Sequence, residues 1–214
     1  MFSYTLGPVA SWSLALLGLL LLVEAARRAR WEAPVREHLH WAFATAAAVL
    51  AHRMSVSLAT GLELHYSGAA FLALLLGYPR ALLSMAAVLA LDGEPGTWGL
   101  RLLLAGALPI WAMWLIVTAS RRWLPGNLFV FLLGCGLFGL FAAYAVQLAG
   151  STLALVALAP SVPRDLVEDF LPYSLLLAAG EAWLEGMLTT VLVVYLPGSV
   201  RLFDEAFYLR RRSP

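Results

Sequence analysis

The sequence predicts an all-α, polytopic membrane bundle with about five to seven transmembrane segments, one of them broken near Pro79. Hydrophobic residues make up 62% of the 214 residues, and the mean hydropathy is +0.83. One soluble core cannot bury so many apolar groups, and several apolar runs approach the ~20 residues that cross a bilayer. The fourteen basic residues are all arginines, and most of them fall in three clusters between these runs.

The first apolar run covers residues 8–26. It is long for the core of a signal peptide and has no basic stretch before it, so we expect an uncleaved first helix. The first arginine cluster follows it directly: Arg27, Arg28, Arg30 and Arg36. The positive-inside bias places all three clusters in the cytoplasm, and therefore the amino terminus outside.

Three apolar runs, residues 39–59, 66–91 and 98–118, separate this cluster from the second, Arg121–Arg122. Two clusters on one side require an even number of crossings, so one of the three runs must be unusual. The middle run is interrupted at Gly77-Tyr78-Pro79-Arg80, where proline removes a backbone donor and restricts the residue before it. We expect a break or a re-entrant bend there.

The same parity problem recurs between the second and third clusters, where the apolar runs are residues 128–147, 151–159 and 172–196. The nine residues of the middle run reach only about 14 Å as a helix. That is too short to span a bilayer, so we expect this run to lie in the interface or to dip partway in. The third cluster is Arg201, Arg210, Arg211 and Arg212.

The chain is expected to divide into a transmembrane domain, residues 1–198, and a cytoplasmic tail, residues 199–214. In the tail Leu202, Phe203 and Phe207 alternate with charged residues, a pattern typical of a short amphipathic helix on the membrane surface. A solvated tail is the alternative.

Composition excludes several function classes. The chain has no lysine, so a Walker-type phosphate loop is absent and any ATP hydrolysis must come from a partner. A lone Cys135 allows no intrachain disulfide and no cysteine metal cluster. A net charge of +1 gives no indication of nucleic-acid binding. With no serine nucleophile motif and no reactive cysteine, an intramembrane hydrolase or redox enzyme has little support.

The segment 61–68 sets Glu63 and His65 two residues apart, just before a long apolar run. This suggests a ligand site at the mouth of the bundle; ordinary interfacial polar residues are the alternative. His52 lies about 9 Å below the outer end of the second helix, whereas His38 and His40 lie about 27–30 Å away. His65 can therefore meet His52 but not the other two, which are only secondary candidates at the cytoplasmic end.

Three charged residues are expected at membrane depth: Arg53 in the second helix, and Glu181 and Glu185 in the last. The two glutamates share a helix face, so they repel each other unless a cation, an arginine or a shared proton neutralises them. Arg53 is the expected partner. Such a set either holds two helices together or couples transport to conformational change.

The order of these features resembles the membrane substrate-capture component of cobalt and nickel energy-coupling-factor transporters. The resemblance rests on His65-Tyr66-Ser67-Gly68 through Leu76-Gly77-Tyr78-Pro79, on Arg121-Arg122, and on Glu185-Gly186-Met187-Leu188-Thr189. It covers about residues 27–196. His38-Leu39-His40 and Leu171-Pro172-Tyr173 are similar to a stand-alone proteobacterial branch labelled energy-coupling factor ABC transporter permease, which implies the bacterial inner membrane.

One departure bears on the metal site that this resemblance implies. Family members that bind cobalt or nickel begin with Met-His and use the terminal amine, the next backbone nitrogen and that histidine ring as ligands. This chain begins Met1-Phe2. Only His65 of the family's site is matched, so the planar all-nitrogen nickel site cannot be carried over whole.

Two functions follow as hypotheses. In the first, the protein captures a divalent transition metal, cobalt, nickel or zinc, on His65, His52 and Glu63, with a separate ATPase and coupling subunit as partners. In the second, it is a non-transporting accessory or assembly subunit that keeps the fold without the metal site. The second hypothesis predicts that the polar groups pair with one another.

Overall fold

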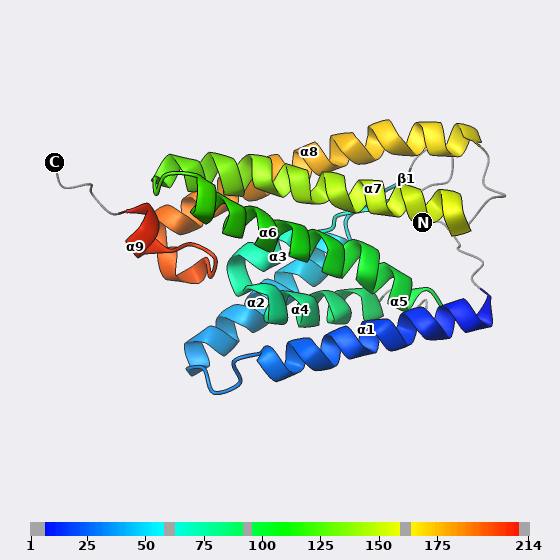
Figure 1. The fold of residues 1–214 in the computed structure, drawn as a ribbon, viewed down its shortest axis with the longest axis horizontal. Helices are drawn as coiled ribbons and strands as arrows, with labels where there is room; N and C mark the ends of the chain where they lie inside the picture. Colours follow the sequence, from blue (N-terminus) through cyan, green and yellow to red (C-terminus); the bar gives the residue numbers. More distant parts are fainter. Residues whose placement is uncertain (1–6, 58–62, 92–95, 159–163, 210–214) are drawn as a thin grey trace.

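The structure, a computed structural model, describes residues 7–57, 63–91, 96–158 and 164–209 (Figure 1). The described chain is a bundle of helices, with one short hairpin of two three-residue strands. Four helical stretches are long and apolar enough to cross a membrane. The predicted all-α membrane bundle is therefore confirmed, and the protein is a multi-pass membrane protein in contact with lipid.

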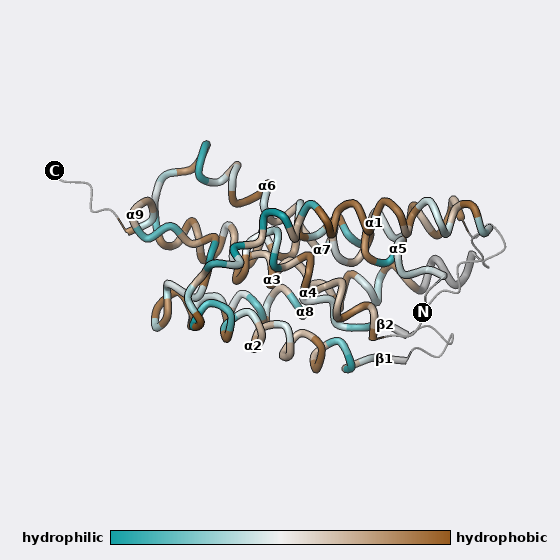
Figure 2. The backbone as a smooth tube through the Cα atoms, turned by 90° about the horizontal axis from the view of Figure 1, so that it is seen from below, coloured by the Kyte–Doolittle hydropathy of each residue, from teal (hydrophilic) through white to brown (hydrophobic). Residues whose placement is uncertain are grey.

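The first two helices are α1 (Pro8–Arg28) and α2 (Val35–His52). Proline at the first position of α1 suits a helix start, because the backbone donor it lacks would be unpaired there in any case. Apolar residues continue along the length of α1 (Figure 2), and only Gly18 and Ala25 are buried. A helix so apolar and so little covered by protein is suited to facing lipid.

The broken segment predicted near Pro79 consists of two short helices, α3 (Ala69–Leu76) and α4 (Tyr78–Ala90). Gly77 between them has φ +74°, a conformation that favours glycine. Pro79 lies in the first turn of α4, where it is tolerated. The break is thus confirmed, but Gly77 makes the turn and the proline only follows it.

Side-chain bonds fix the direction of α4. Ser84 bonds to both Trp41 and Thr45 of α2, and the arginine just past the end of α2, Arg53, bonds to Leu91 O just past the end of α4. The two helices therefore run parallel, and α3 runs in the opposite sense. This pair of short helices supplies the even number of passes that the arginine clusters require.

The remaining long helices are continuous. Residues 98–123 form one of them, built from α5 (Trp98–Arg101), the π-helical η1 (Leu102–Ala107) and α6 (Leu108–Trp123). Residues 130–158 form the next long helix, in which the π-helical η2 (Val130–Gly139) continues into α7 (Leu140–Leu158). The last long helix is α8 (Arg164–Tyr195).

The prediction that residues 151–159 form a separate short element is wrong. Residues 151–158 continue α7 without a break. Gly150 looks like a boundary in the sequence, yet in the structure a Cβ there would stand 2.5 Å from the Leu108 side chain, so glycine serves close packing on α6. Two crossings, not three, therefore separate the second and third arginine clusters.

The first two arginine clusters, and Arg201 of the third, lie at one end of the bundle, which we call the arginine end. Arg80 donates to Arg30 O, Arg121 donates to Leu202 O, and the backbone N–H of Arg201 donates to Leu75 O. The opposite end, called the hairpin end, holds the start of α1 and the end of α7 (Figure 1). Which end faces the cytoplasm stays a prediction.

The described part of the tail folds back on the bundle through η3 (Pro197–Ser199) and α9 (Glu205–Tyr208). Phe203 and Tyr208 are buried, with their rings stacked 5.7 Å apart and both against Phe131 of η2. The Asp204 side chain caps α9 by accepting from Phe207 N. This segment contributes apolar residues to the core at the arginine end; residues 210–214 lie outside the described part of the chain.

Candidate functional site

Two histidines meet toward the hairpin end. His52 is the last residue of α2, and His65 is the last residue of β2 (Glu63–His65), which pairs antiparallel with β1 (Ser55–Ser57). The two rings are stacked with centroids 5.2 Å apart and planes at 25°. The prediction that His65 meets His52 is confirmed; their role as ligands stays a prediction.

Each ring has its Nδ1 against a backbone carbonyl. His52 Nδ1 lies 2.8 Å from Tyr66 O, and His65 Nδ1 lies 3.3 Å from His52 O. A carbonyl can only accept, so a neutral ring in either position carries its proton on Nδ1 and its lone pair on Nε2. A backbone carbonyl behind the ring is the arrangement usually found for metal-ligating histidines.

The segment after His65 is fastened to α8 by the two glutamates, both of which are buried. Tyr66 donates its hydroxyl to Glu185 Oε1 at 2.5 Å, and Tyr144 of α7 donates to Glu185 Oε2 at 2.6 Å. The backbone N–H of Ser67 donates to both oxygens of Glu181, at 3.1 and 3.2 Å. Both carboxylates thus receive hydrogen bonds from groups that carry no formal charge.

The turn into α3 completes this attachment. Ser67 Oγ bonds to Gln147 Oε1 of α7 at 3.0 Å. Gly68 has φ +65°, which a side chain would oppose, and it leads directly into the buried α3. The segment from His65 to Gly68 is therefore held on α7 and α8 at the same time, which fixes the position of His65.

Tyr66, Tyr144 and Gln147 are absent from the sequence-based candidate set. Tyr66 directly follows His65 in the sequence, and this adjacency could have identified it as a site residue. The other two residues lie about eighty positions further along the chain in a helix read only as apolar. No local pattern indicates that their polar groups turn toward this segment.

The predicted pairing of Arg53 with Glu181 or Glu185 is wrong. Arg53 caps the C-terminus of α2 with an exposed side chain, and its guanidinium donates to Leu91 O at 3.4 Å. Hydroxyl and amide donors occupy the carboxylates instead. An arginine at a helix end can extend toward the interface, so it needs no buried partner.

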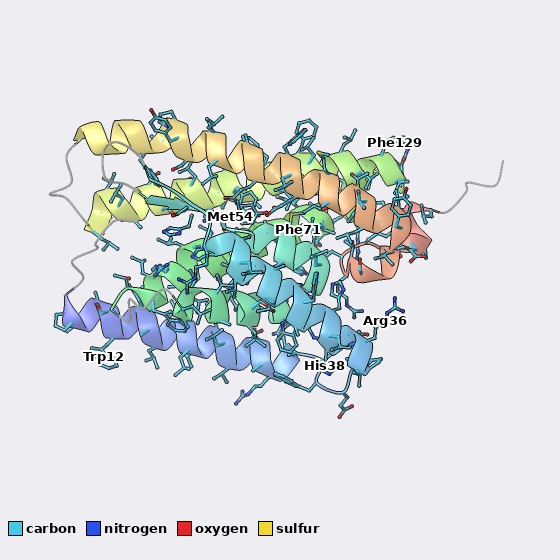
Figure 3. The ribbon with its side chains drawn as sticks, turned by 180° about the vertical axis from the view of Figure 1, so that it is seen from behind. Trp12, Arg36, His38, Met54, Phe71 and Phe129 are labelled. Carbon is cyan, nitrogen blue, oxygen red and sulfur yellow. The ribbon has the colours of Figure 1, made fainter. Side chains whose placement is uncertain are left out.

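His38 and His40 lie toward the arginine end, away from the histidine pair, as predicted. Figure 3 labels His38 near Arg36, well separated from Met54, which follows Arg53 at the end of α2. His38 Nε2 lies 3.0 Å from Trp31 O, in the loop between α1 and α2. His40 lines a cavity at that end, and its Nε2 is buried without a hydrogen-bond partner among the described residues.

No three His, Cys, Asp or Glu side chains lie close enough to hold a metal ion together within the described parts of the chain. The histidine pair supplies two imidazoles. Glu63 begins β2, but its side chain lies outside the described part of the structure. The predicted three-residue set His65, His52 and Glu63 is therefore untested.

Comparison with known proteins gives one finding. No curated protein and no solved structure matches the chain. A protein-family model described as CbiM, cobalt uptake substrate-specific transmembrane region, matches residues 3–200. That match spans nearly all of the 214 residues and includes the histidine pair, the broken helix and both glutamates. The chain therefore belongs to the family of cobalt uptake substrate-specific transmembrane proteins.

Proposed function

We propose that this protein captures a divalent transition metal at the hairpin end of the bundle and passes it inward with the help of a separate ATPase and coupling subunit. Membership of a cobalt-uptake family supports a transition-metal substrate. Imidazole ligands suit cobalt, nickel and zinc alike. The arginine end faces the cytoplasm of a bacterial inner membrane by the positive-inside bias, which puts the amino terminus and the histidine pair toward the outside.

The observation that carries this proposal is the orientation of the two histidines. Both rings turn Nδ1 to a backbone carbonyl, which leaves Nε2 as the nitrogen with the lone pair. Their rings are stacked 5.2 Å apart. Two neighbouring imidazoles in the same tautomer are two candidate ligands for one ion.

The carboxylates have a positioning role in this proposal. Glu185 and Glu181 hold Tyr66 and Ser67, the residues directly after His65. A ligand fixed by its neighbours loses less conformational freedom on binding an ion than a mobile one. Glu63, two residues before His65, is the proposed third ligand.

One observation favours the accessory-subunit alternative. Both oxygens of Glu185 are occupied by tyrosine hydroxyls, and those of Glu181 are occupied by Ser67 N. That is the pairing of polar groups expected of a bundle that keeps the fold without a metal. In the transport hypothesis the same hydrogen bonds fix the segment that follows His65 and so position that ligand.

A cobalt-uptake assay tests the proposal. Cells express the chain together with an ATPase and a coupling subunit from the same genome, and the uptake of radioactive cobalt is measured. We expect uptake above that of cells with an empty vector, abolished by His65→Ala and retained by His38→Ala at the other end of the bundle. Uptake no higher than the vector control, from a protein that is present and folded in the membrane, would support the accessory role instead.

A further inference from the structure

The arginine end contains a cavity of about 1310 Å³ between α1, α2, α4, α6 and the end of α8. Its volume is above the range usual for small-molecule sites. No residue of the histidine site described above lines this cavity. The cavity therefore needs an explanation of its own.

The lining is strongly basic. Five arginines contribute to it, against two carboxylates: Arg28, Arg30, Arg36, Arg80 and Arg201, with Glu24 and Glu37. Only Arg80 among them is buried, and the other four are exposed. An excess of positive charge gathered along one recess attracts an anion. Basic pockets between transmembrane helices on the cytoplasmic side are where anionic headgroups bind.

Ion pairs within the cavity involve three of these five arginines. Glu24 pairs with Arg28 at 2.6 Å and also accepts from the hydroxyl of Tyr78. Glu37 is shared between Arg30, at 3.9 Å, and Arg80, at 3.4 Å. Among the described residues no carboxylate lies within ion-pair distance of the remaining two, Arg36 and Arg201.

The fold holds these two arginines at the cavity. The backbone N–H of Arg201 bonds to Leu75 O, and its side-chain stem lies beside Gly77, where an added Cβ would be 3.4 Å away. Arg36 stands in the first turn of α2, at the end of the bundle shown in Figure 3. The buried Nε2 of His40 adds a further polar atom that has no partner among the described residues.

The wall on the side of α6 and α8 is apolar and aromatic. Trp111, Trp114 and Tyr195 line it, and each is at least 40% exposed. Tryptophan and tyrosine favour the level of the lipid headgroups. The cavity thus combines basic side chains with exposed aromatic ones, as a site for a lipid headgroup would.

We propose that this cavity binds a phosphate-bearing anion, with Arg36 and Arg201 contacting the phosphate. Guanidinium groups bind phosphate through paired, charge-assisted hydrogen bonds, and the ion pairs at Glu24 and Glu37 hold the other arginines in place around it. An anionic phospholipid headgroup and a free phosphate compound share this chemistry. This inference does not depend on the proposed metal transport.

Native mass spectrometry of the purified protein in uncharged detergent tests the proposal. Phosphatidylglycerol and phosphatidylcholine are titrated in separate arms, and inorganic pyrophosphate in a third. We expect phosphatidylglycerol to be retained over phosphatidylcholine, or pyrophosphate to bind by itself; the first result identifies a lipid and the second a free phosphate compound.

The double variant Arg36→Gln/Arg201→Gln should weaken the retained ligand by about tenfold or more, since two charge-assisted contacts are lost. Its matched control is Arg27→Gln/Arg122→Gln, which removes the same charge from exposed arginines outside the cavity lining. The control should bind as the wild type does. Equal losses in both double variants, no loss in either, or no binding of any of the three probes would overturn the proposal.

Discussion

Tyr66 donates its hydroxyl to Glu185 at 2.5 Å, and this bond joins the residue after His65 to a helix 119 positions further along the chain. Tyr144 donates to the other oxygen of the same carboxylate, which is fully buried. Loss of either hydrogen bond should lower the free energy of unfolding, because a buried polar group without a partner destabilises the folded state. This bond connects the stability of the bundle to the position of the proposed ligand.

The variant Glu185→Gln tests that connection. A glutamine has nearly the same shape but one acceptor oxygen, so one of the two tyrosine hydroxyls loses its acceptor. We expect a loss of about 1–3 kcal/mol of stability, measured by thermal unfolding in detergent. Glu32→Gln, on an exposed side chain, is the control and should unfold as the wild type does. Equal stability of the two variants would show that Glu185 need not accept both bonds.

Gly186 and Gly180, both in α8, provide a second matched pair. A Cβ at Gly186 would stand 2.7 Å from Gly136 O of η2, whereas a Cβ at Gly180 would meet nothing within 4 Å. Gly186→Ala should therefore force α8 and η2 apart and cost about 1–3 kcal/mol. Gly180→Ala should be neutral or slightly stabilising, because alanine favours the helix. Similar melting temperatures for the two variants would refute the close helix contact.

A buried ion pair of Arg53 would make that arginine more important for stability than Arg121, but the structure indicates the reverse. Arg121 donates to Leu202 O at 2.5 Å and ties α6 to the tail, whereas the exposed Arg53 makes a 3.4 Å bond to Leu91 O. Arg121→Ala should lower thermal stability by about 1.5–3 kcal/mol, and Arg53→Ala by less than about 1 kcal/mol. A larger loss for Arg53→Ala would restore the buried pairing that the sequence suggested.

Labelling with a membrane-impermeant maleimide tests the topology. In a Cys135→Ala background, Gly96→Cys should be labelled in intact spheroplasts, because it is exposed toward the hairpin end and a Cβ there meets nothing within 4 Å. Arg122→Cys, exposed at the arginine end, should be labelled only after the membrane is opened. Labelling of both positions from the same side would contradict the proposed orientation and the fold of α5 to α6.

Segment-level features of this fold were predictable from the sequence. Apolar runs identified the long helices, and the Gly77-Pro79 pattern identified the break. The described arginines of the three clusters lie at one end, as the positive-inside bias predicts. The length of α7 was not predictable in the same way, because Gly150 and the polar residues after it imitate a helix boundary. In the structure that glycine lies against Leu108, and only the packing of another helix reveals its purpose.

The site was predictable only in part. The meeting of His52 and His65 was predicted correctly, but the depth assigned to His52 was wrong: the expected helix reached residue 58, whereas α2 ends at His52 and a strand hairpin follows and carries His65. The partners of the glutamates were not predictable, because opposite charge suggested Arg53, whereas the donors include two tyrosine hydroxyls and the backbone amide of Ser67. Depth in a helix says how far along the bundle a group lies, but not which way its side chain points.

Metal binding by the purified protein tests the central claim most directly. Isothermal titration with cobalt, nickel and zinc should show one site in the wild type and in His38→Ala. We expect binding to be lost in His65→Ala and weakened by about 10–100-fold in Tyr66→Phe, which removes the bond to Glu185 that positions the ligand. Acidification should also weaken binding, because protons compete for the imidazole lone pairs. Unchanged binding in His65→Ala would place the site elsewhere, and no binding in the wild type would contradict the account.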